Sequence, residues 1–399
     1  MSEVYMEYRE NIKNGDKLSA LGFGTMRLPQ VKKEIDEAES IRILRLAYEK
    51  GINYFDTAYV YNDGRSEEVL GKAIMPFREK VKIATKLPLR LIKSYEDFDK
   101  LFYTSLKRLN TTYVDYYLLH CIISYDQYKH MVDLGVNDWI KQKKESKEIV
   151  NIGFSFHGCG DDFIKVIDAY DWEFCQIQYN YFDVNYQAGQ KGLKYAYSKQ
   201  IPVIIMEPLR GGALVNKLPE KAQKTFKNAN STRSFADWGL RWLYNQKEVT
   251  LVLSGMGSEA MLLSNIESAS TSKIAELSKS ELQVYDKVIN EMLLADRIPC
   301  TGCSYCMPCP NGVDIPACFS VYNSKSLAGR IQNIGNYVSS CGGLGEKQGF
   351  ASQCIGCRLC EKKCPQAIKI SEELKKVKKT FEIPLIKPII RLVKKFKKF

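Results

Sequence analysis

Two runs of four closely spaced cysteines constrain what this 399-residue chain can fold into more than any other feature. They consist of Cys300, Cys303, Cys306 and Cys309, and of Cys354, Cys357, Cys360 and Cys364. The second run is spaced C-x2-C-x2-C-x3-C and precedes a proline, which is how bacterial ferredoxins bind [4Fe–4S] clusters. Three thiolates at this spacing can wrap one corner of a cluster, while the fourth turns away to a second cluster. The sequence therefore predicts a module that binds two [4Fe–4S] clusters.

The first run is less regular than the second, because its last gap is one residue shorter. By analogy with ferredoxins the runs exchange their fourth ligands, so that Cys364 joins the first three cysteines and Cys309 joins the later three. Zinc is the alternative metal, but its sites usually mix fewer cysteines, spaced as two distant pairs. Cys318 and Cys341 fit neither run and are expected to be buried or spare thiols. Because so short a module buries little core, we expect the clusters to hold it together and the metal-free protein to lose its structure.

The rest of the chain alternates short β-type runs with amphipathic helical segments. The predicted strands cover residues 19–24, 53–57, 81–86, 114–120, 151–155, 174–180, 202–207 and 250–255. Eight strands that alternate with helices are typical of an α/β fold, a (β/α)8 TIM barrel, with a doubly wound sheet as the alternative. The expected domains are this barrel over residues 1–271, a linker helix over 272–297, a small α+β dicluster ferredoxin-like domain over 298–373 and a basic tail over 374–399.

The net charge of +12 is concentrated in the tail, where residues 374–399 hold ten lysines or arginines and one acidic residue, Glu382. The remainder is nearly balanced, which argues against nucleic-acid binding. Residues 384–399 place apolar and basic side chains on opposite helical faces, as peripheral membrane helices do; an acidic partner or a solvated tail are the alternatives. No signal peptide or spanning segment is evident, so we expect a cytoplasmic protein, peripheral to the membrane if the tail binds it.

Four polar residues occur where predicted strands end. Asp56, Lys86 and His120 close three different strands, and Tyr61 follows Asp56 in the loop that leaves the same rim. Barrel enzymes place their catalytic groups at the carboxyl ends of strands. Each residue alone has an ordinary explanation, such as a turn former, a solvated lysine or a core histidine. Their joint occurrence at one rim indicates an active site.

These segments resemble the aldo/keto reductase family over residues 16–270, through LGFGTMRLP, NYFDTAYVYNDGRSEEVLGKAI, KIATKLP, DYYLLH and IGFS. CTGCSYCMPCPNGVDIP and CIGCRLCEKKCPQAI extend the resemblance to a branch with an appended ferredoxin-type domain. The family's catalytic tetrad falls on Asp56, Tyr61, Lys86 and His120. The resemblance implies an oxidoreductase in which Tyr61 protonates a carbonyl oxygen. Lys86 would lower the pKa of this phenol, Asp56 would keep Lys86 charged, and His120 would orient the carbonyl.

The resemblance also implies a nicotinamide nucleotide over the barrel mouth, held by Ser155, Gln176, Ser254 and Asn265. Two positions depart from the family, because Phe156 stands where an asparagine is frequent and Met206 where an aromatic residue is common. Segment 254–265 also lacks the lysine and arginine that grip a 2′-phosphate elsewhere in the family. NADP preference is therefore not supported, and NAD or another cofactor such as a flavin remains open.

Three functions are compatible with these motifs, because clusters pass single electrons whereas a nicotinamide takes two as a hydride. The first is an oxidoreductase that couples reduction of a small carbonyl compound to electron transfer through the clusters, with ferredoxin or another redox partner. The second is an NAD(P)H carbonyl reductase whose clusters are structural. The third is a membrane-associated electron carrier or scaffold with an inactive barrel.

Overall fold

The computed structural model describes residues 6–32, 34–158, 160–293, 298, 300, 302, 306–325, 329–342, 348–364 and 368–383. The chain divides into two compact units. The first unit contains residues 1–184, 188–211 and 232–279, and the second contains residues 185–187, 212–231 and 280–399. The predicted amphipathic segment 384–399, together with Cys303, lies outside the described residues.

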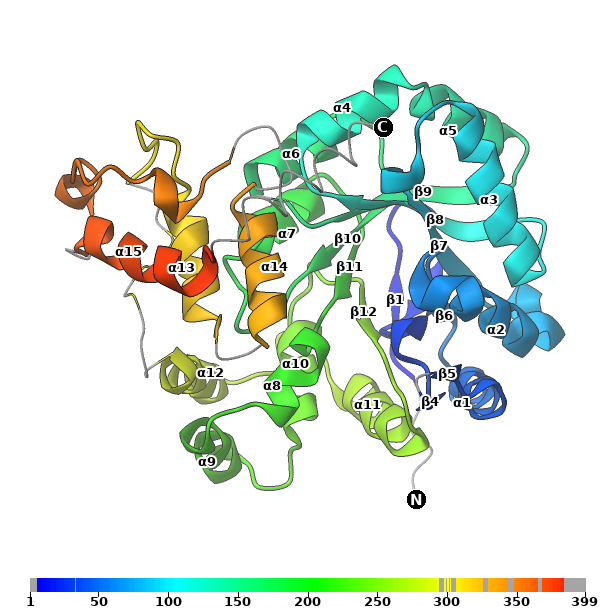
Figure 1. Cartoon of the computed structure of the whole chain (residues 1–399). Coiled ribbons are helices and arrows are strands. Elements are labelled where there is room, and N and C mark those ends of the chain that lie inside the picture. Colours follow the sequence, from blue (N-terminus) through cyan, green and yellow to red (C-terminus); the bar gives the residue numbers. More distant parts are fainter. Residues whose placement is uncertain are drawn as a thin grey trace. The chain divides into compact units, whose positions relative to one another are not determined.

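Eight parallel strands of the first unit close into a barrel (Figure 1). In sequence order they are β3 (Leu21–Gly24), β6 (Tyr54–Asp56), β7 (Lys82–Pro88), β8 (Val114–Ile122), β9 (Ile149–Phe156), β10 (Phe174–Gln178), β11 (Val203–Met206) and β12 (Leu251–Ser254). β12 pairs with β3 through Val252 and Leu21, so the sheet has no free edge. This closure confirms the predicted TIM barrel and excludes the doubly wound sheet.

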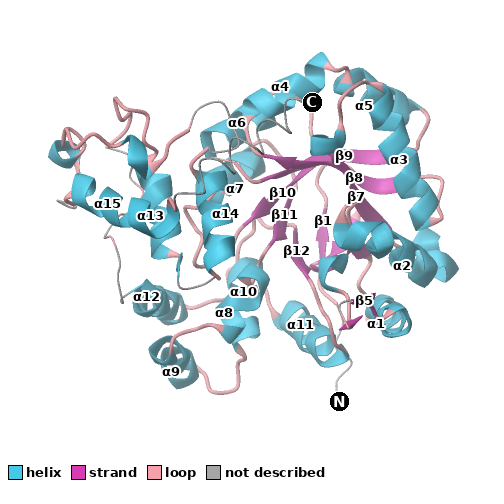
Figure 2. Ribbon diagram, in the orientation of Figure 1, coloured by secondary structure: helices cyan, strands magenta, loops and turns pink. Residues whose placement is uncertain are grey.

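Helices cover the outside of the strands in this unit, as Figure 2 shows. They are α1 (Glu37–Glu49), α2 (Arg65–Ile74), α3 (Glu96–Leu109), α4 (Tyr125–Asp133), α5 (Val136–Glu145), α6 (Gly160–Asp168), α7 (Gly189–Ser198), α10 (Phe235–Tyr244) and α11 (Glu259–Thr271). Serine or aspartate caps start several of them; Ser124, for example, accepts the Gln127 N–H at the start of α4. Such caps satisfy backbone donors that the first helical turn leaves unpaired.

The strands alternate between two apolar cores, because successive side chains of a strand point to opposite faces. On β12, Leu251 and Leu253 belong to a small cluster with Tyr54, Tyr116 and other residues of the barrel strands. Val252 lies between them and belongs to the large cluster shared with the surrounding helices. The barrel interior is therefore packed, and only the strand ends are available for polar groups.

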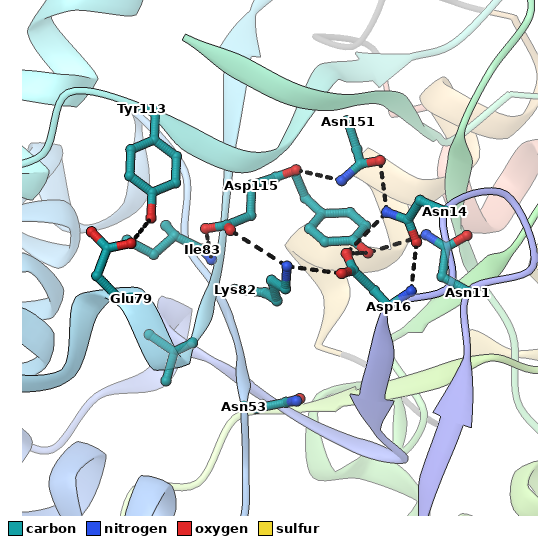
Figure 3. Close-up of polar contacts among 12 residues, drawn as sticks. Asn11, Asn14, Asp16, Asn53, Glu79, Lys82, Ile83, Tyr113, Asp115 and Asn151 are labelled. Carbon is teal, nitrogen blue, oxygen red and sulfur yellow. Dashed lines mark hydrogen bonds and ion pairs between the residues drawn. The ribbon is translucent and has the colours of Figure 1, made fainter. Parts of the chain in front are cut away.

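A network of polar side chains occupies the amino-terminal ends of the strands (Figure 3). Asp16, just before β2 (Lys17–Ser19), accepts a hydrogen bond from the Tyr116 hydroxyl at 2.7 Å and pairs with Lys82 at 2.8 Å. Asp115 pairs with Arg78 at 2.9 Å and accepts the Ile83 N–H. The hairpin of β1 (Tyr8–Glu10) and β2 thus ties to the start of β7 and β8, at the end opposite to the predicted catalytic residues.

The second unit has an apolar core of its own, formed around α13 (Ile315–Asn323), α14 (Arg330–Ser340) and α15 (Ile370–Phe381). Its other helices are α8 (Ala213–Asn216), α9 (Glu220–Ala229) and α12 (Lys279–Leu293). The described residues from 298 to 383 form helices and cysteine-bearing loops, and no strand is among them. No helix in the described part of the chain has the length and apolar character needed to cross a bilayer.

Two expected domain boundaries differ from the structure. α15 runs across the boundary expected at residues 373 and 374, and its Leu374, Val377 and Phe381 are buried in the second core. These apolar side chains hold the start of the supposed tail inside the folded unit. α12, expected to be a linker, belongs to the second unit, where Tyr285 packs against Phe226 of α9 with ring centroids 5.9 Å apart.

Candidate active site and cluster segment

Three neighbouring strands bring the four predicted catalytic side chains together. Asp56 is the last residue of β6, Lys86 lies in β7 and His120 lies in β8. Tyr61 begins a short 3-10 turn, η2 (Tyr61–Gly64), which follows β6. All four lie toward the carboxyl ends of their strands, the rim at which barrel enzymes carry their chemistry.

Lys86 is the centre of this group. Its Nζ atom lies 2.6 Å from Asp56 Oδ1, 2.6 Å from the Thr57 carbonyl oxygen and 3.4 Å from the Tyr61 hydroxyl. The side chain is only 1% exposed. An ammonium group has three N–H donors, and these three acceptors use all of them. The cation is therefore fixed against the phenol rather than free to swing toward solvent.

Tyr61 stands between Lys86 and His120. The Lys86 Nζ atom lies 4.8 Å from the centre of the Tyr61 ring, and the His120 ring meets that ring edge-on at 6.1 Å. Asn62, Asp63 and Gly64 after it all have positive φ angles, so the loop is strained. Gly64 has a φ of 89°, a backbone conformation that residues with a side chain rarely adopt, which explains the glycine. This loop therefore aims the phenol at the rim.

Burial is a main cause of the pKa shifts of Tyr61, Lys86 and His120. Burial raises the pKa of Tyr61, and the Lys86 cation opposes this rise without cancelling it. The Lys86 cation thus acts on the phenol pKa in the expected direction, but desolvation is the larger effect and the pKa of Tyr61 is raised. Burial acts to lower the pKa of Lys86, but Asp56 and Tyr61 together raise it. Burial and the Lys86 cation hold the pKa of His120 well below its usual range, so the imidazole is neutral.

A β-bulge in β8 sets the direction of His120. The pairing of β8 with β9 shifts register between Leu119 and Ile122. Cys121, inside the bulge, has a φ of 63°, and its N–H donates to the Ser155 hydroxyl at 2.8 Å. Bulges of this kind re-aim side chains next to active sites. Ser155 thus supports the catalytic rim and keeps its hydroxyl proton available for another acceptor.

The residues expected to hold a nicotinamide nucleotide form two pairs. Gln176 on β10 is the Cα partner of Ser155 on β9, and its buried Oε1 atom has no hydrogen-bond partner among the described residues. The other pair is Asn265 and Ser254, joined by a hydrogen bond of 3.0 Å. An unpaired buried acceptor is costly, and the amide N–H of a nicotinamide carboxamide would satisfy it. The residues present therefore fit that group.

Two arginines that sequence reasoning missed reach the rim beside these pairs. Arg27, in the turn η1 (Thr25–Arg27) after β3, packs along Gly255 and donates to the Gly211 carbonyl oxygen at 3.2 Å. Arg210, which follows β11, pairs with Asp183 and has a buried Nη1 atom without a partner in the described structure. The sequence signal that could have revealed them is a basic residue soon after a predicted strand. Neither arginine lies in segment 254–265, where we looked for cations that bind the nucleotide.

The described cysteines of the two runs lie in loops of the second unit. Burial raises the pKa of the Cys360 thiol, and Cys354 and Cys309 add to the rise, so Cys309 of the first run lies near the second run. Cys357 is exposed. Gly356 and Arg358, on either side of it, both have positive φ angles, as a tight wrapping loop requires. Among the described residues no three ligand side chains converge on one ion, whereas the donor chemistry of the runs, thiolates at ferredoxin spacing, fits iron–sulfur clusters.

Cys318 and Cys341 are buried, as expected for cysteines outside the runs. Their Sγ atoms lie 3.6 Å apart between α13 and the end of α14. The nearby Tyr337 hydroxyl donates to Glu382 at 2.8 Å and accepts the Ala351 N–H. Together with the apolar side chains around them, these contacts give the second unit a core of its own. This core is larger than we expected from the sequence, and the dependence of the unit on its clusters stays a prediction.

The fold and the rim define a (β/α)8 oxidoreductase, and sequence comparison supplies its family. The profile of the aldo/keto reductase family matches residues 20–290, and that of the 4Fe-4S dicluster domain matches residues 299–370. The chain belongs to the aldo/keto reductase family and carries a C-terminal dicluster domain, as the motifs predicted. It is an oxidoreductase of the aldo/keto reductase type.

Individual relatives cover the barrel part of the chain. An uncharacterized oxidoreductase, YqkF, of Bacillus subtilis is 27% identical over 68% of this chain and 93% of its own length. L-galactose dehydrogenase of Arabidopsis thaliana is 28% identical over 65% and 87%. Methylglyoxal reductase YeaE of Escherichia coli is 26% identical over 69% and 92%.

Solved structures show the same fold. Aldo-keto reductase AKR11C1 of Bacillus halodurans, in its holo form, superposes with a TM-score of 0.60 and 23% identity, over 71% of this chain and 96% of that one. An aldo/keto reductase of Klebsiella pneumoniae, in complex with NADP and acetate, gives a TM-score of 0.57 and 22% identity, over 70% and 95%.

Proposed function

We propose that the barrel reduces small carbonyl compounds with a nicotinamide nucleotide, using Asp56, Tyr61, Lys86 and His120. The observation that carries this proposal is the buried Lys86 cation, whose three donors hold Asp56, the β6 end and the Tyr61 hydroxyl in one group. A reduced nicotinamide would supply a hydride to the carbonyl carbon. The chain's own residues supply the proton and the positive charge that the developing alkoxide needs.

The proton comes from Tyr61. Its raised pKa keeps the phenol protonated at neutral pH, so it donates a hydrogen bond to the carbonyl oxygen and then its proton. Lys86, 3.4 Å away, stabilises the phenolate that remains. Neutral His120, edge-on to Tyr61, offers an N–H to the same oxygen and fixes its position. Asp56 balances the Lys86 charge inside a site that excludes most water.

The nucleotide would lie along the rim from β9 to β12. The unpaired Gln176 Oε1 atom and the Ser155 hydroxyl would hold the carboxamide. Met206 lies beside Gln176, with its sulfur 3.6 Å from Nε2, and a thioether packs well against an aromatic face. Arg27 would bind a phosphate group, because it brings to segment 254–257 a cation that the segment itself lacks.

The substrate is expected to be a small, polar carbonyl compound. Relatives of this chain are named for L-galactose and for methylglyoxal, both small and oxygen-rich. The four side chains of the rim have the groups needed to polarise and protonate such a carbonyl. The names of these two relatives and the four side chains of the rim support this substrate class.

The test is steady-state oxidation of NADH and NADPH with small aldehydes, comparing wild type with Arg27→Glu. We expect KM for the preferred nucleotide to rise about 10- to 100-fold, since a charge-assisted hydrogen bond contributes about 1.5–3 kcal/mol. The kcat value should change little, because the phosphates are remote from the reacting carbon. Lys100→Glu, an exposed charge reversal on α3, is the control and should leave KM unchanged. Failure of wild type to oxidise either nucleotide with any carbonyl would overturn the proposed function.

The surface around Cys357 favours a second activity, exchange of electrons with a carrier protein. Ile355 is 72% exposed and Leu359 is 49% exposed, on the loop that presents Cys357. Exposed basic side chains follow in the same part of the chain: Arg358, Lys362, Lys363 and Lys369. Exposed apolar side chains close in sequence to several cations suit an acidic one-electron carrier of the ferredoxin type. Two reduced carriers would deliver the two electrons that, with two protons, convert a carbonyl to an alcohol.

Charge reversal at this surface tests the carrier. Lys362→Glu combined with Lys363→Glu should lower the rate constant for cluster reduction by an acidic reduced ferredoxin about tenfold at low salt. Reduction by a small viologen should change little in the same variant, because it needs no docking. Lys141→Glu, which reverses an exposed charge on α5, is the matched control. A rate that does not depend on salt, or an equal loss in the control, would contradict this docking surface.

A further inference from the structure

Arg108, near the end of α3, holds from outside the loop that carries Tyr61. Its Nη1 atom donates to the Tyr59 carbonyl oxygen at 3.0 Å. Its guanidinium also stacks over the Tyr59 ring, 4.4 Å from the ring centre. The same group lies against Gly64, where an added Cβ atom would come within 2.4 Å of the guanidinium carbon. One side chain from another helix therefore contacts the loop on both sides of Tyr61.

Glu67 on α2 fixes Arg108 in this place. The Glu67 carboxylate is fully buried, and its Oε2 atom accepts a hydrogen bond from Arg108 Nη1 at 3.2 Å. Its other oxygen, Oε1, accepts one from the Thr85 hydroxyl at 2.6 Å. Thr85 directly precedes Lys86 on β7. Two side chains thereby tie the loop to the strand whose ammonium group lies 3.4 Å from the Tyr61 hydroxyl.

The loop needs such support because its backbone is strained. Asn62 and Asp63 have φ angles of 49° and 55°, a region that residues with a side chain rarely occupy. Such a backbone persists only where the surrounding structure holds it. The hydroxyls of Thr57 and Ser66, 2.9 Å apart, close the base of the loop. Arg108 adds contacts nearer its tip.

Packing alone does not explain an ion pair at this depth. The Glu67 side chain is 0% exposed and that of Arg108 is 22% exposed. A buried ion pair is often no more stabilising than well-packed apolar side chains of similar volume. A planar guanidinium offers what apolar groups lack, because its N–H donors have fixed directions and reach a carboxylate and a backbone carbonyl oxygen at once. The pair therefore sets the direction of the loop as well as filling space.

We propose that Arg108 and Glu67 are positioning residues for proton transfer: they fix residues 59–64, so that the Tyr61 hydroxyl stays within reach of Lys86 and of the substrate oxygen. This inference rests on the proposed function and names residues that act on its proton donor. Both act through the loop rather than on the substrate. Loss of either contact should therefore lower kcat, which depends on the placement of the phenol, and leave KM close to that of wild type.

The test compares Arg108→Met with wild type in the full-length anaerobic protein, using 2-oxopropanal and whichever of NADH and NADPH wild type oxidises faster. We expect kcat to fall about 10- to 100-fold, because a small displacement of a catalytic group is costly. KM should stay within about twofold of wild type. Arg108→Lys, which keeps a cation for Glu67, should recover part of kcat. Lys107→Met, which removes an exposed neighbouring cation on α3, is the matched control and should leave both constants unchanged.

Amide hydrogen exchange provides a second measurement that does not need turnover. In Arg108→Met the amides of residues 59–64 should exchange about tenfold faster than in wild type, since the loop opens locally. The amides of β7 and β8 should keep their wild-type protection. Arg108→Lys should show the same pattern with a smaller change.

The outcomes separate this inference from the proposed function. Unchanged kcat in Arg108→Met, or a loss that falls on KM alone, would overturn the inference and leave carbonyl reduction in place. Loss of protection throughout the barrel would show that Arg108 supports the fold in general, and would overturn the inference as well. If wild type reduces no aldehyde with either nucleotide, the proposed function fails, whatever the exchange of residues 59–64 shows.

Discussion

Replacing Tyr61 with phenylalanine should lower kcat for carbonyl reduction by about 10²- to 10⁴-fold, the range that general acid catalysis contributes. KM should change little, because the ring that packs beside Lys86 and His120 is retained. The loss falls on kcat because the phenol proton is needed only as the alkoxide forms. Stopped-flow or steady-state oxidation of the preferred nucleotide measures the effect.

Tyr59→Phe is the matched control for this change. Tyr59 lies two residues earlier, and its ring stacks under the Arg108 guanidinium at 4.4 Å. Removing its hydroxyl should leave kcat within about twofold of wild type. Because burial raises the pKa of Tyr61, wild-type reduction should stay level through neutral pH and fall only in the alkaline range, where the phenol loses its proton. Undiminished turnover by Tyr61→Phe would remove the phenol from the mechanism.

Removal of iron from the anaerobic protein by chelation should open the cysteine loops of the second unit. Thiolates that are brought together only by a cluster repel one another once it is gone, and metal-binding energy is folding energy in such modules. Amide hydrogen exchange in residues 348–364 should accelerate by about 100-fold or more. The intact protein should contain about eight iron and eight sulfide per chain, as two [4Fe–4S] clusters require.

The amides of α13 and α15 should respond less than these loops, because their core includes Phe319, Leu374 and Phe381. Amides of β7 and β8 in the other unit serve as the internal control, and their exchange should not change. Iron-free protein that keeps full protection in residues 348–364 would contradict a structural role for the clusters. If α13 and α15 also lose their protection throughout, the whole module depends on its clusters for folding, as we expected from the sequence.

The grouping of the four candidate catalytic side chains could be predicted because they follow recognisable strands. Asp56, Lys86 and His120 each end a short apolar run, and parallel strands bring their carboxyl ends to one rim. The spacing of the cysteines predicted the dicluster domain for a similar reason, since the ligands are local in sequence. Most of the fold could therefore be predicted from patterns that extend over only a few residues.

The remaining features depend on contacts between distant segments. Arg27 reaches segment 254–257 only because β12 pairs with β3 and closes the barrel. The net pKa of Tyr61 depends on how deeply the folded chain buries it, and sequence shows the Lys86 neighbour but not the burial. The bulge at Cys121 and the burial of the apolar face of α15 likewise depend on packing.

The charged network at the amino-terminal ends of the strands has a consequence for how this protein can change. Asp16, Lys82 and Asp115 secure the hairpin and the strand starts there, without sharing a partner with Tyr61 or His120. Substitutions at the opposite rim, at Met206 for instance, leave these anchors intact. New substrate preferences can therefore accumulate at one end of the barrel while the other end preserves a foldable scaffold, which makes the rim a practical place for directed evolution.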